Sequence, residues 1–131
     1  MKVIHESGTR KSSVARATVK LGAGVIRINN QLIGSFPDTL FKAKVEEVLV
    51  IAGDTAKKVN VDVNVMGGGV NGQAEAARIA IAKALSVFDK KLHSTYLDYD
   101  RALLVADVRR KETRKPNCHG KARAKRQKSY R

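Results

Sequence analysis

Apolar and polar residues alternate along several stretches of the chain, a period typical of strands with one buried face. Residues 59–65 (VNVDVNV) show it most clearly, with four valines on one side and Asn, Asp and Asn on the other. Residues 13–21 (SVARATVKL) alternate similarly, and residues 25–29 (VIRIN) follow a Gly-Ala-Gly turn. The pattern predicts three strands, the first two in chain order pairing as a hairpin. A further short strand is predicted at Leu32 and Ile33.

Two longer stretches place apolar residues three or four positions apart, as in an amphipathic helix. The first opens after Pro37 and stops at Gly53, where a C-terminal glycine is expected. The second begins near Asn71 or Gly72 and places Glu75 in its positively polarised first turn. The predicted buried positions are Phe41, Val45, Val48, Leu49 and Ala52 in the first helix, and Ala77, Ile81, Ala84, Leu85 and Phe88 in the second.

A third, shorter helix or turn is predicted around residues 94–104, because Leu97, Leu103 and Leu104 still need burial. With both long helices on one face of a mostly antiparallel sheet, the fold class is a two-layer α/β (α+β) sandwich. The core ends at Val108. We therefore expect one globular domain over residues 1–108, followed by a tail over residues 109–131.

Charge separates these two parts of the chain. The 131 residues include 26 Lys and Arg against 12 Asp and Glu, a formal net charge of +14. Residues 109–131 alone carry a net +10, and they contain no Val, Ile, Leu, Phe or Met. Such a segment cannot bury a core, so we expect it to be extended and to order along the phosphates of a polyanion.

Several function classes are disfavoured by composition. No apolar run approaches the roughly 18 to 20 residues that span a bilayer, so we expect a soluble protein with no membrane partner. The single cysteine, Cys118, and three scattered histidines favour a reducing, cytosolic compartment and give no metal-ligand spacing. Asp98, Asp100 and Asp107 lie beside Arg101 and Arg109, which suits ion pairs better than acid–base catalysis. We expect no enzyme activity, no cofactor and no metal.

The glycine run Gly67, Gly68 and Gly69 precedes the second long helix, a setting that can bind anions. A nucleoside triphosphate loop would need Lys and Ser or Thr after Gly72, but Gln73 and Ala74 follow instead. A phosphotransfer enzyme built on this turn would also need carboxylates nearby, and only Glu75 is available. Two interpretations remain open: a tight turn that needs positive φ, or a contact with RNA phosphates.

A second candidate for phosphate contact lies at the entry to the strand over residues 13–21. Arg10, Lys11 and Arg16 are interspersed there with Ser, Thr and Gly, whose hydroxyls and backbone N–H groups can approach a phosphate closely. A merely solvated strand face is the alternative interpretation.

Three segments together resemble one family. GTRKSSVARATVKLGAGVIRINNQ at 8–31, GGGVNGQAEAARIAIAKAL at 67–85, and DVRRKETRKP with KARAKRQKSYR at the end are similar to the universal small ribosomal subunit protein nine family. The ending QKSYR is similar to archaeal and eukaryotic members rather than bacterial ones, and the short N-terminus favours the archaeal kind. Asn117, Cys118, His119 and Arg126 depart from the family pattern.

The resemblance implies a ribosomal RNA binder in the head of the small subunit, in the cytoplasm, beside neighbouring head proteins. It also implies a left-handed βαβ crossover, against the usual rule, and a tail that reaches P-site tRNA in translation. A free-standing RNA-binding regulator is the alternative function. The candidate ribosomal RNA contacts are Arg10, Lys11, Arg16, Gly67, Gly68, Gly69, Arg109, Arg110, Lys111, Arg114, Lys115, Lys121, Arg123, Lys125 and Arg126, and the candidate tRNA contacts are Lys128, Ser129, Tyr130 and Arg131.

Overall fold

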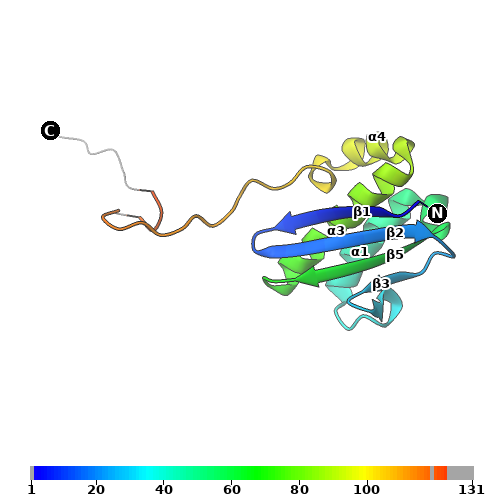
Figure 1. Ribbon diagram of the computed structural model, residues 1–131, viewed down its shortest axis with the longest axis horizontal. Helices are drawn as coiled ribbons and strands as arrows, with labels where there is room; N and C mark the ends of the chain where they lie inside the picture. The colour runs from blue at the N-terminus through cyan, green and yellow to red at the C-terminus, as the bar shows by residue number, and fades with distance from the viewer. Residues whose placement is uncertain (1, 119, 124–131) are drawn as a thin grey trace.

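The computed structural model describes residues 2–118 and 120–123 and shows a mixed five-stranded sheet (Figure 1). The strand order is β1-β2-β5-β3-β4. β3 and β5 run parallel, and the other three neighbouring pairs are antiparallel. The strands are β1 (Ile4–Arg10), β2 (Ser13–Leu21), β3 (Ile26–Ile28), β4 (Gln31–Leu32) and β5 (Val59–Met66).

The predicted hairpin between residues 13–21 and 25–29 is wrong. β2 pairs instead with β1 and with β5, so β5 lies between β2 and β3. β1 has no clear alternation in the sequence, because Ile4 is the only large apolar residue on its inward face. Gly8 also lies on that face, where a Cβ would be 2.4 Å from the Ala76 carbonyl oxygen. Close backbone packing against a helix therefore replaces the apolar alternation that would have revealed this strand.

The two long helices, α1 (Thr39–Ala52) and α3 (Val70–Phe88), cover one face of the sheet, behind the strands in Figure 1. The Asp38 side chain accepts hydrogen bonds from the Leu40 and Phe41 N–H groups at 2.9 and 3.1 Å, which caps the first long helix. Gly53 ends that helix with φ of +57°, as its predicted C-terminal role requires. The helices are α1 (Thr39–Ala52), α2 (Asp54–Lys57), α3 (Val70–Phe88) and α4 (Lys90–Tyr99), with short 3-10 turns η1 (Ile33–Ser35) and η2 (Arg101–Leu103).

Three boundary predictions need correction. Because α3 begins at Val70, Glu75 lies in its second turn and not in the first. The helix predicted around 94–104 is two elements, α4 and η2, which begin four residues earlier and break at Asp100. Ile33 belongs to η1, and β4 ends at Leu32.

The core lies between the inward side chains of the sheet and the helices. The four β5 valines are buried, as are Ala15, Ala17 and Val19 of β2. Of the predicted helical positions, Leu49 and Phe88 are only partly buried and the others are buried. Leu97 is exposed, and Tyr96 is buried in its place with its hydroxyl donating to the Val48 carbonyl at 3.0 Å.

After η2 the chain leaves the two layers. Residues 106–115 form neither helix nor strand, and Figure 1 shows this segment running away from the sheet. Within the described part of the chain, no residue beyond Leu103 is buried. No helix among the described residues is both long enough and apolar enough to cross a membrane.

Candidate nucleic-acid interface

Three of the predicted RNA-contacting segments meet at one end of the sheet. The β2–β5 register pairs Val14 with Met66, which brings the β1–β2 turn beside the glycine turn that follows β5. The contact is close, because a Cβ on Gly67 would lie 2.7 Å from the Ser12 carbonyl oxygen. The chain after η2 passes the same end, where the Arg110 guanidinium donates to the Thr9 hydroxyl at 2.9 Å. This end of the sheet therefore collects residues from both ends of the sequence.

A groove of about 780 Å³ lies between the β1–β2 turn and the start of the tail. Lys11, Arg110 and Lys111 are exposed there, as are Ser12 and Arg109. So many cations around one groove repel one another, and a polyanion in the groove relieves that repulsion. The groove is lined by Arg10, Lys11, Ser12, Arg109, Arg110 and Lys111.

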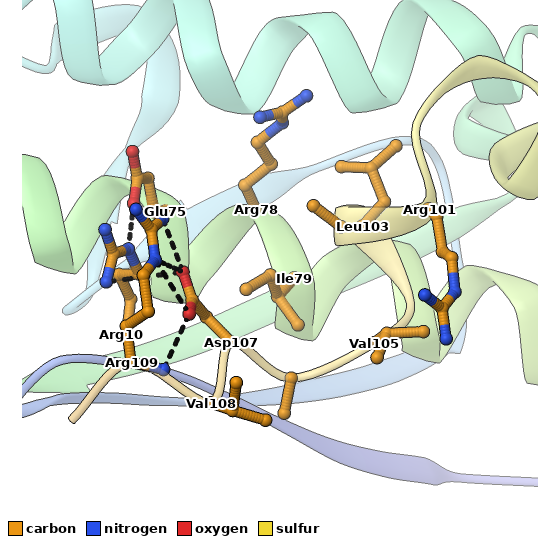
Figure 2. A pocket seen from close by; sticks show the side chains of 12 residues that line it. Arg10, Glu75, Arg78, Ile79, Arg101, Leu103, Val105, Asp107, Val108 and Arg109 are labelled. Carbon is orange, nitrogen blue, oxygen red and sulfur yellow. Dashed lines mark hydrogen bonds and ion pairs between the residues drawn. The ribbon is translucent and has the colours of Figure 1, made fainter.

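Arg10 differs from the other cations of the groove because two carboxylates hold it. Its Nε donates to Glu75 Oε2 at 2.7 Å, and its Nη1 lies 3.4 Å from Asp107 Oδ2 (Figure 2). The Arg10 side chain is only 14% exposed. Lys44 also reaches Glu75, with Nζ 3.3 Å from Oε1. Burial favours the neutral form of Glu75, but the hydrogen bonds from Arg10 and Lys44 outweigh it and lower its pKa.

Asp107 joins this cluster to the tail. It accepts from the Arg109 backbone N–H at 2.8 Å and from Arg109 Nη2 at 2.8 Å. These hydrogen bonds from Arg109 hold the pKa of Asp107 well below its usual range, so Asp107 is ionised at neutral pH. The predicted ion pair of Asp107 with Arg109 is confirmed. Asp100, in contrast, pairs with Arg78 of α3 at 3.4 Å.

A second hollow lies beside the groove. It has a volume of about 510 Å³, and its apolar lining includes Ile79, Leu103 and Val105 (Figure 2). Arg10 and Arg109 line both cavities. The Arg10 and Arg109 side chains thus lie between an apolar hollow and the cationic groove.

The glycine turn has the positive φ angles expected of a tight turn, which is one of the two interpretations of this segment. Gly67 and Gly68 have φ of +77° and +67°, a region that side-chain-bearing residues rarely adopt. A Cβ on Gly68 would lie 2.1 Å from the Ser13 hydroxyl oxygen. Gly69, at the N-terminus of α3, has φ of −92° and open space around it. Positive φ and the lack of space for a Cβ therefore favour glycine at Gly67 and Gly68. Neither constraint applies at Gly69.

The remaining predicted contacts lie elsewhere. Arg16 is exposed on the uncovered face of the sheet, between Ser7 and Asn64. Arg123 pairs with Glu112, with Nε 3.0 Å from Oε2. Arg114, Lys115 and Lys121 line a smaller groove of about 340 Å³ together with Gly120. Lys125, Arg126, Lys128, Ser129, Tyr130 and Arg131 lie outside the described residues.

The carboxylates around Arg10 were not found from the sequence. Glu75 is 65 positions from Arg10, and no local pattern relates them. Asp107 was identified only as a partner of its neighbour in sequence. The one available signal was the position of Asp107 just before the basic run at 109–111, and Glu75 has no such signal around it.

The fold and the groove define a small, basic α+β protein with a cation-lined groove at one end of its sheet. The family model described as ribosomal protein S9/S16 matches residues 8–131. The chain is 45% identical over 134 residues to the small ribosomal subunit protein uS9 of Methanococcus maripaludis strain C7, covering all of both chains. It is 47% identical over 133 residues to the protein of that name from Methanothrix thermoacetophila, again over both full lengths, and 47% identical over 130 residues to that of Picrophilus torridus, covering 98% of this chain and 97% of the relative.

The chain therefore belongs to the S9/S16 family of ribosomal proteins and is of the archaeal type. It is a structural, non-enzymatic component of the small ribosomal subunit in the cytoplasm. The resemblance found in the three sequence segments is confirmed.

Proposed function

We propose that the chain binds ribosomal RNA in the head of the small subunit through the groove and the tail. This proposal rests on the groove. The cations that line it come from two segments that are 98 to 101 positions apart in the sequence. Lys11 and Ser12 come from the β1–β2 turn, and Arg110 and Lys111 come from the tail. Segments this distant meet only in the folded chain, so the charge is organised in three dimensions.

RNA binding at such a site is mainly electrostatic. Each phosphate that a Lys or Arg neutralises releases condensed counterions, which favours association and makes it sensitive to salt. The Ser12 hydroxyl and the exposed glycine at position 69 leave room for a phosphate to approach the backbone. We propose that Arg16, Arg114, Lys115, Lys121 and the other predicted cations of the tail contact RNA outside this groove.

The proposal also includes the division of the chain into a domain and a tail, and the handedness of a strand crossover. We expect residues 1–108 to act as the globular domain and residues 109–131 as an arm along RNA. The parallel neighbours β3 and β5 are joined through α1, which makes a βαβ crossover. By resemblance to the family, we propose that this crossover is left-handed and that neighbouring head proteins contact the domain.

Sedimentation of the native, tagged chain tests this function. We expect the chain to cosediment with small subunits and to remain there after a wash in moderate salt. A free-standing regulator would instead stay near the top of the gradient, bound to smaller RNAs. That result would overturn the ribosomal role and favour the regulator.

The end of the tail is proposed to contact P-site tRNA through Lys128, Ser129, Tyr130 and Arg131. Deleting Ser129 to Arg131 removes one cation of 26, so we expect subunit assembly to survive. Because a charge-assisted hydrogen bond contributes about 1.5 to 3 kcal/mol, P-site tRNA affinity should fall about tenfold or more. Filter binding of tRNA to subunits carrying the shortened protein measures this. Unchanged affinity would leave the tail as an anchor to ribosomal RNA only.

A further inference from the structure

We infer that Asp107 is a positioning residue that assembles the cationic groove, and that Arg10 serves this assembly and is not itself a phosphate ligand. This inference rests on the proposed RNA-binding function and assigns roles within that site. The observation behind this inference is that Asp107 pairs with both Arg10 and Arg109.

Arg10 has little capacity left for a phosphate. Its guanidinium contacts Glu75 and Asp107, and its side chain is 14% exposed. Arg109 shares Asp107 but has a side chain that is 76% exposed. A phosphate that reached Arg10 would have to approach two carboxylates, and their like charge opposes that approach. Lys11, Arg109, Arg110 and Lys111 remain as the cations that RNA can reach.

Asp107 determines where the tail begins its course. Its Oδ1 accepts the Arg109 backbone N–H at 2.8 Å, which fixes the chain two residues further on. The Arg110 guanidinium then reaches Thr9 on β1 at 2.9 Å. Through Arg10, Asp107 also connects to Glu75 on α3. The tail is thereby held against β1 and α3 at its first residues, so its cations face Lys11 across the groove.

A carboxylate at this place has two opposite effects on RNA binding. Its charge repels phosphates, so its removal should tighten binding if charge alone mattered. If Asp107 positions the tail, its removal should weaken binding although the net charge of the chain becomes more positive. The two roles therefore predict changes of opposite sign.

The test compares Asp107→Asn with Asp54→Asn in the free full-length chain. Both substitutions remove one negative charge and keep the shape of the side chain. Asp54 is exposed on α2, at the far end of the sheet from the groove, and its ion pair is with Lys57. The probe is a 12-nucleotide oligouridylate, whose affinity is measured by fluorescence anisotropy at fixed salt. Backbone amide shifts of residues 11–12 and 109–111 are followed by NMR during the same titration.

We expect Asp107→Asn to bind the oligonucleotide about three- to tenfold more weakly, because oriented charge-assisted contacts are lost. Asp54→Asn should bind as the native chain does or slightly more tightly. In Asp107→Asn the amide responses at 109–111 should diminish while those at Lys11 and Ser12 persist. A general loss of folding would instead alter both sets of amides before RNA is added.

Equal or tighter binding by Asp107→Asn, with unchanged amide responses, would overturn the positioning role. The proposed function would survive that result if the native chain still bound the oligonucleotide and cosedimented with subunits. Failure of the native chain in both assays would overturn the function itself. The two failures are thus distinguished by the behaviour of the native chain.

Discussion

A Gly68→Val variant is expected to lose a large part of its native stability. Gly68 has φ of +67°, and its Cβ position lies 2.1 Å from the buried Ser13 hydroxyl oxygen and 3.1 Å from the Ser13 backbone nitrogen. A β-branched residue resists this conformation, and the strained backbone and the overlap together should cost about 3 kcal/mol or more. Because small domains have only about 5 to 15 kcal/mol of stability, the change is large. Urea unfolding followed by circular dichroism measures it.

Gly69→Val is the matched control for this experiment. Gly69 has φ of −92° and ψ of 172°, a conformation open to any residue, and no atom lies within 4 Å of its Cβ position. Its cost should be about 1 kcal/mol or less, since valine is merely a poor N-terminal capping residue. Equal losses in the two variants would contradict the role of positive φ. A Gly68→Val chain that folds normally but binds RNA weakly would instead favour phosphate contact.

Replacing Lys11, Arg110 and Lys111 together by Gln should produce the largest loss of RNA affinity. With about 0.7 counterions released per neutralised phosphate of a single strand, the slope of log affinity against log salt should fall by about 2. At about 0.1 M salt this corresponds to roughly a hundredfold weaker binding. All three residues are exposed and line the groove, so the fold should be retained. The salt series is measured with the oligouridylate, and unfolding of the same variant checks that it remains folded.

The control for this variant replaces Lys57, Lys58 and Lys90 by Gln. These residues are exposed, and Lys58 lies at the end of the sheet opposite the groove, where its carbonyl accepts the Gly22 N–H at 3.0 Å. The net charge changes by the same amount, but the salt slope should stay close to that of the native chain. Similar losses in both triple variants would show that net charge, and not the groove, determines binding.

Local patterns predicted those elements whose cause is local. The β5 valines alternate because every second side chain faces the helices. The bounds of α1 follow from a capping side chain at Asp38 and a glycine at Gly53, and both act within a few residues. The motifs at 8–31, at 67–85 and at the end of the chain together likewise identified the family.

The strand predictions were wrong or incomplete where strand pairing depends on segments that are distant in the sequence. Residues 13–21 and 25–29 suit a hairpin locally, but β5 pairs with both of them and separates them. β1 is a strand because β2 and α3 flank it, although its own residues do not alternate clearly. Pairing free energy between strands depends on which segments meet, and a local pattern does not contain that information.

The candidate site likewise has some features that the local sequence predicts and others that only tertiary contacts determine. The sequence by itself determined that cations gather before the first long strand and in the tail, and that glycines follow β5. Only the tertiary structure decided that Lys11 faces Arg110 and Lys111, and that Glu75 and Asp107 occupy Arg10. The reason is that electrostatic interactions depend on distance in space. Folding sets those distances through burial of the apolar core, which the charged residues do not control.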